Sequence, residues 1–96
     1  MPAWFVATAY SVSNPAEFEE YQKLAKPTVE QYGGKFIAGG FKVEVADGNW
    51  SPIALVVAEF ENLDRAKEWY HSPEYSAVKP LRLNSTDSAL ILVDGG

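Results

Sequence analysis

The stretch that decides the fold is Ala3–Val12 (AWFVATAYSV), which carries apolar side chains on both of its alternating faces. Successive side chains of a strand point to opposite faces of the sheet, so a half-exposed strand alternates apolar with polar residues. Segments 52–60 and 88–94 show the same two-sided pattern. We therefore expect a sheet that is covered on both faces.

The residues after this strand predict a helix. Asn14 is a good N-cap and is followed by proline, which suits the first helical position. Apolar residues then recur at helical spacing across 18–32. Pro27 should kink this helix because it removes one backbone hydrogen bond. Gly33 and Gly34 should end it with a left-handed cap.

Residues 35–46 read as the second strand. Gly39 and Gly40 interrupt it and indicate a bulge or bend within one element. The later part alternates apolar with charged residues, which is typical of an edge strand. Turn residues at 47–49 predict a hairpin onto the strand at 52–60.

A second helical region follows the hairpin. Asn62 is a suitable N-cap for a helix that reaches Tyr70, and Ser72 can cap a further short helix that Pro80 closes. We expect residues 84–87 to form a polar connection into the last strand.

The predicted order is β-α-β-β-α-β in a single domain over residues 1–96. Right-handed crossovers place both helices on one face of a four-stranded antiparallel sheet, so the predicted fold class is α+β and ferredoxin-like. The other face would then expose a large apolar patch. Its simplest cover is a second copy of the chain, so we expect a homodimer.

Composition excludes several classes of function. Thirteen acidic residues against eight basic ones give a formal net charge of −5, which disfavours nucleic acid and anionic membrane surfaces as partners. The chain has no cysteine, which excludes disulfides and thiolate chemistry and suits a cytoplasmic location. It has one histidine without a companion cluster, so we expect no metal and no cofactor.

Few side chains are candidates for binding. Arg82 is either a surface ion pair, the favoured interpretation, or a cleft residue suited to a carboxylate. Tyr21, Tyr70 and Tyr75 are favoured as core aromatics, but their hydroxyls could also orient a ligand. The sharpest hypothesis is that Arg82 holds a small, partly apolar anion in a cleft bordered by Tyr21 and Tyr70. His71 falls on the polar side of its helix, where a solvated or capping role is expected.

Several motifs resemble one known family. They are Trp69–Tyr75 (WYHSPEY), Tyr32–Phe36 (YGGKF), Arg82, and the ending Leu90–Gly95 (LILVDG). Together they are similar to the domain-of-unknown-function family numbered thirteen-thirty, in the dimeric α+β barrel superfamily. The resemblance implies two sheets packed face to face in a dimer, and it implies no activity or catalytic residue.

Two hypotheses about function follow. The first is a small protein that binds or transforms a partly apolar anion in a cleft between helices and sheet. The second is a non-catalytic dimeric module that regulates or binds another protein. A cavity of a few hundred Å³ lined by the residues above would favour the first, and a solid core would favour the second.

Overall fold

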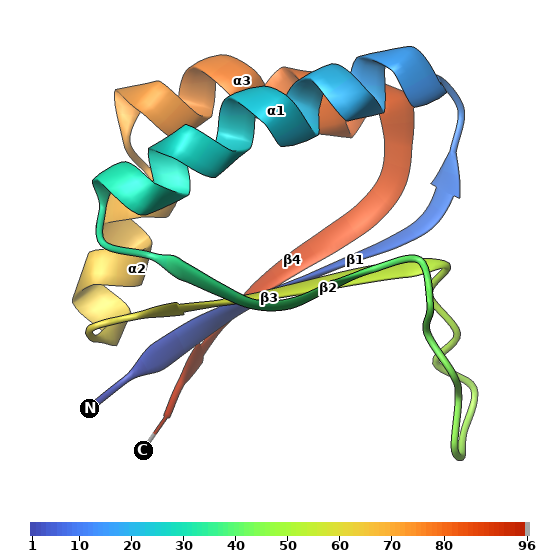
Figure 1. Cartoon of the computed structure of the whole chain (residues 1–96), viewed down its shortest axis with the longest axis horizontal. Coiled ribbons are helices and arrows are strands. Elements are labelled where there is room, and N and C mark those ends of the chain that lie inside the picture. Colours follow the sequence, from blue (N-terminus) through green and yellow to red (C-terminus); the bar gives the residue numbers. More distant parts are fainter. Residues whose placement is uncertain (96) are drawn as a thin grey trace.

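The computed structural model describes residues 1–95 and contains a four-stranded antiparallel sheet with three helices (Figure 1). The strand order is β2-β3-β1-β4, which confirms the predicted ferredoxin-like arrangement. The elements in chain order are β1 (Ala3–Val12), α1 (Pro15–Gln31), β2 (Lys35–Gly40), β3 (Ala54–Phe60), α2 (Leu63–Tyr70), α3 (Pro73–Ser85) and β4 (Thr86–Asp94).

The helix starts follow the predicted capping residues. The side-chain oxygen of Asn14 accepts the Glu17 backbone N–H at 3.1 Å, and that of Asn62 accepts the Arg65 N–H at 2.8 Å. Ser72 caps α3 in the same way. At the other end of α1, Gly33 adopts a φ of +79°, the left-handed conformation that glycine tolerates best.

The helix α3 is longer than predicted, because it continues through Pro80 to Ser85. Tertiary contacts hold its last turn. The Ser85 carbonyl accepts the Ser13 backbone N–H at 2.8 Å, and its hydroxyl donates to the Leu81 carbonyl. The predicted polar connection at 84–87 is therefore wrong, since α3 runs directly into β4.

The strand β2 is shorter than predicted. It ends at Gly40, whose φ of +142° turns the chain away from the sheet, and residues 41–53 form an irregular connection. The predicted strand to residue 46 is therefore wrong, and so is the predicted turn at 47–49. The predicted hairpin pairing is confirmed, because β2 pairs antiparallel with β3. In Figure 1 this connection extends beyond the sheet, on the side opposite α1 and α3.

The core lies between the helices and one face of the sheet. Its centre is Trp69, whose ring lies 4.9 Å from that of Phe5 in a stacked arrangement and 4.3 Å from that of Tyr75. Phe60 and Val29 complete the centre, and all five side chains are buried. Such aromatic contacts contribute stability beyond the area they bury.

The opposite face of the sheet is apolar and carries no helix of the described residues (Figure 1). Val6 on β1 pairs with Val57 on β3 and with Ile91 on β4, so these side chains share the uncovered face. Ile91 and Val93 on β4 are exposed. The two-sided apolar pattern of the strands is thus confirmed. Within residues 1–95, no helix has the length and apolar character that crossing a bilayer requires.

Candidate functional site

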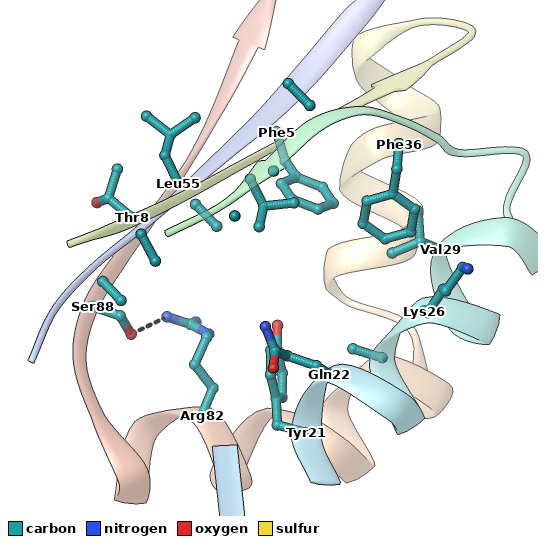
Figure 2. Close-up of a pocket in the computed structure, with 18 of the residues that line it drawn as sticks. Phe5, Thr8, Tyr21, Gln22, Lys26, Val29, Phe36, Leu55, Arg82 and Ser88 are labelled. Carbon is teal, nitrogen blue, oxygen red and sulfur yellow. Dashed lines mark hydrogen bonds between the residues drawn. The ribbon is translucent and has the colours of Figure 1, made fainter. Parts of the chain in front are cut away.

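A cavity of about 540 Å³ separates α1 and α3 from the helix-facing side of the sheet (Figure 2). Every helix and every strand contributes to its wall. The wall is mostly apolar, with Phe5 from β1, Val29 from α1 and Phe36 from β2 along one side. Ligand sites of this size are usually apolar with a few converging polar groups, and the polar groups here gather where Arg82 enters.

Arg82 is a buried charged residue in the lining of the cavity. It lies in the last turn of α3 and is only 5% exposed. Its Nη1 donates to Ser88 Oγ at 2.9 Å, and its Nε donates to Tyr75 Oη at 3.3 Å (Figure 2). It makes no ion pair with any residue from 1 to 95. The favoured prediction of a surface ion pair is therefore wrong.

The hydroxyl of Tyr21 lies at the same end of the cavity. Tyr21 comes from α1, and its Oη is 2.9 Å from Tyr75 Oη. Burial, together with the neighbouring Tyr75, raises the pKa of Tyr21 above its usual range, and the nearby Arg82 guanidinium offsets part of this rise. Tyr21 is therefore a neutral hydroxyl at any pH near neutrality.

Tyr70 lies outside this group. It does not line the cavity, but borders a shallow depression on another part of the surface. Lys79 Nζ sits 4.7 Å from the centre of the Tyr70 ring. The cleft therefore brings together Tyr21 and Arg82 from the predicted set, and not Tyr70.

Sequence reasoning missed several lining residues. Ser88 was predicted to begin the last strand but not to belong to a site, and the structure places it in the cavity lining. The signal was the alternation of the strand: Ser88 lies two residues before Leu90, which packs against the core, so both side chains share the helix-facing side of the sheet. Gln22 and Lys26 lie on α1 among polar residues, and neither was predicted to belong to a site. Both are exposed, and they line the side of the cavity formed by that helix (Figure 2).

The charge of the lining is opposite in sign to that of the protein. Lys26 and Arg82 line the cavity, and none of the described lining residues is Asp, Glu or His. The whole chain carries a net charge of −5. The cavity is thus a locally positive site on an acidic protein. Residues 1–95 also contain no group of three or more His, Cys, Asp or Glu side chains placed to hold a metal ion.

His71 lies away from the cavity. It follows the last residue of α2, is exposed, and borders the same shallow depression as Tyr70. The predicted solvated or capping role of His71 agrees with its position, because it is exposed and is the C-cap residue of α2.

We expect the His71→Ala variant to keep its free energy of unfolding and any ligand affinity within about 1 kcal/mol of the parent, the usual scale for a surface substitution. Chemical denaturation and binding titrations on both proteins check this. Loss of binding in this variant would place the site at the depression instead of the cavity.

The fold and the cavity define the class: a ferredoxin-like α+β protein with a cavity between its helices and its sheet. The model of the family described as Domain of unknown function (DUF1330) matches residues 2–96, so the chain belongs to that family. No curated protein matches the chain in sequence.

Solved structures share the fold at low sequence identity. A protein of unknown function from Rhodopseudomonas palustris matches with a TM-score of 0.77 and 19% identity, over 99% of this chain and 82% of that one. A dimeric ferredoxin-like protein of unknown function from Jannaschia sp. CCS1 matches with a TM-score of 0.76 and 7% identity, over 98% and 99%. SnoaB, a cofactor-independent oxygenase from Streptomyces nogalater, matches with a TM-score of 0.67 and 16% identity, over 99% and 93%.

Proposed function

We propose that the protein binds a small, partly apolar, anionic molecule in the cavity between its helices and its sheet. The observation that carries this proposal is the buried guanidinium of Arg82, which has no carboxylate partner within residues 1–95 and lines an apolar cavity. A buried charge is costly unless it is paired, so an anionic ligand would supply the missing partner.

The working unit in this proposal is a homodimer. The uncovered face of the sheet is apolar and would be buried against a second copy. Solved structures of the same fold from Jannaschia sp. CCS1 and Bacteroides fragilis are described as dimeric, which supports this assembly. Because the cavity lies on the helix side of the sheet, it stays outside such an interface.

Transformation of the bound molecule is a second candidate, favoured by the shared fold with the oxygenase SnoaB. The hydroxyl and guanidinium donors of the cavity suit the stabilisation of negative charge on an oxygen atom. The described lining offers no carboxylate or imidazole to remove a proton. Binding is therefore the primary proposal, and any reaction would need a substrate that is already ionised.

Replacing Arg82 by glutamine should weaken the binding of small aromatic acids by about 10- to 150-fold. A hydrogen bond to a charged group contributes about 1.5–3 kcal/mol, and glutamine removes the charge but keeps an amide donor. Thermal shift with a panel of aromatic and aliphatic acids identifies a ligand of the parent. Isothermal titration with that acid then compares the two proteins.

The matched control is Lys26→Gln, which removes the other cation of the lining. Lys26 is exposed, so its charge is screened by solvent and its loss should weaken binding by less than about threefold. Equal affinities of the parent and Arg82→Gln for the acid would contradict the proposal. A panel in which no acid raises the melting temperature of the parent would also contradict it.

A further inference from the structure

The hydrogen-bond donors of Arg82 are only partly used inside the protein. A guanidinium carries five N–H donors and no acceptor. One donor goes to Tyr75 Oη and one to Ser88 Oγ. The guanidinium also interacts with the Tyr21 hydroxyl, and it lines the cavity with the N–H groups that no residue from 1 to 95 uses (Figure 2). They are therefore available to a molecule in the cavity.

Ser88 has no proton left to offer that molecule. Thr86 Oγ1 lies 2.6 Å from the Arg82 carbonyl and 2.8 Å from Ser88 Oγ. A hydroxyl has one proton and a carbonyl can only accept, so the Thr86 proton goes to the carbonyl. The proton between the two hydroxyls must then come from Ser88. Ser88 accepts from Arg82 and donates to Thr86, which fixes Arg82 in place.

The direction of the bond between Tyr75 and Tyr21 follows from the same reasoning. Tyr75 is fully buried and does not line the cavity. Its oxygen accepts the Nε–H of Arg82, and among residues 1–95 the acceptor within reach of its own proton is Tyr21 Oη. A buried hydroxyl without an acceptor is costly, so Tyr75 donates to Tyr21. The proton of Tyr21 is thereby directed elsewhere, and Figure 2 shows the Tyr21 hydroxyl pointing into the cavity.

We infer that the polar end of the cavity is a donor-only site that selects a monocarboxylate, held jointly by the free N–H groups of Arg82 and the O–H of Tyr21. This inference rests on the proposed function. Tyr75 is a positioning residue, because it orders the chain of bonds from Arg82 through Tyr75 to Tyr21. A donor chain of this kind polarises each successive hydroxyl and strengthens the last donor.

The chemistry of a carboxylate matches this site. An ionised carboxylate only accepts hydrogen bonds, at about four lone-pair positions, and it neutralises one buried guanidinium. A primary amide of the same shape turns an NH₂ group towards donors and leaves them unpaired. Since Tyr21 stays protonated well into the alkaline range, its role as a donor does not change near neutral pH. The apolar wall formed by Phe5, Val29 and Phe36 suits a flat hydrocarbon body.

The test compares acids with their amides in the full-length protein. Benzoate and phenylacetate are titrated beside benzamide and phenylacetamide, for the parent and for Tyr21→Phe. We expect each acid to bind the parent at least about 100-fold more tightly than its amide, because the amide leaves buried donors unpaired. The Tyr21→Phe substitution should weaken binding of the acids by about 10-fold and leave the weak binding of the amides unchanged.

Tyr70→Phe is the matched control, since it removes a tyrosine hydroxyl that lies outside the cavity. It should leave the affinity for the acids unchanged. One result would separate the two proposals: the acids bind, Arg82→Gln weakens their binding, and Tyr21→Phe does not. The inferred direction of the hydrogen bond from Tyr75 to Tyr21 would then be wrong, and the proposed function would stand. Amides that bind as tightly as acids would overturn the donor-only site. If no acid binds the parent, the proposed function itself fails, and the inference fails with it.

Discussion

Replacing Trp69 by alanine should lower the free energy of unfolding by about 3–5 kcal/mol, the range for removal of a large buried aromatic side chain. Trp69 is 1% exposed and packs against the rings of Phe5, Phe60 and Tyr75. Its Nε1 also donates to Thr28 Oγ1 at 3.1 Å. Small domains have a total stability of about 5–15 kcal/mol, so this single change removes much of it. Urea denaturation followed by circular dichroism measures the loss.

Two further variants show whether the loss comes from the packed ring. Trp69→Phe keeps an aromatic ring but gives up the bond to Thr28 and some volume, and should cost about 1–2 kcal/mol. Leu24→Ala removes an exposed side chain from α1 and should cost less than about 1 kcal/mol. A Trp69→Ala protein as stable as the Leu24→Ala protein would contradict the central place of Trp69 in the core.

Placing a lysine at position 91 should break the proposed dimer. Ile91 lies on the uncovered face of the sheet, where it pairs with Val6, and it is 54% exposed in the single chain. The substitution therefore costs the monomer little. In the dimer it would bury an unpaired charge, which costs about 2–5 kcal/mol and weakens association by about 30- to 4,000-fold.

The molar mass in solution is measured by light scattering after size-exclusion chromatography, at low micromolar protein concentration. The parent should elute with about twice the chain mass, and Ile91→Lys with the mass of one chain. Leu83→Lys is the matched control, because Leu83 is 55% exposed but belongs to α3, on the other side of the sheet. It should remain dimeric. A stable, non-aggregating monomer of the parent under these conditions would contradict the proposed assembly.

Local signals predicted most of the fold. Asn14, Asn62 and Ser72 each bind a backbone N–H three residues later, and such caps depend on short-range geometry. The errors arose where distant contacts outweigh local preference. Pro80 usually ends a helix, but the last turn of α3 is held by Ser13 in the loop after β1. No local pattern reveals that contact.

The candidate site was predicted in part for a similar reason. Adjacent residues on a helix point about 100° apart, so Trp69 and Tyr70 cannot both face the same pocket. Which of them enters the core depends on how α2 packs on the sheet, and the structure buries Trp69. Arg82 had two competing interpretations because its environment forms only in the folded chain. Its partners are Tyr75, two turns earlier on α3, and Ser88 on β4.

The alternation of side chains along β1 has a consequence for how the protein can change over evolution. Phe5 and Ala7 line the cavity, while Trp4 and Val6 belong to the uncovered face. In the proposed dimer and its ligand complex, ligand preference and subunit association would thus be encoded in interleaved positions of one strand. Each could then change by point substitution without affecting the other. Insertion of one residue early in β1 would exchange the two sets and disable both at once. Selection should therefore tolerate substitutions in this strand far better than changes in its length.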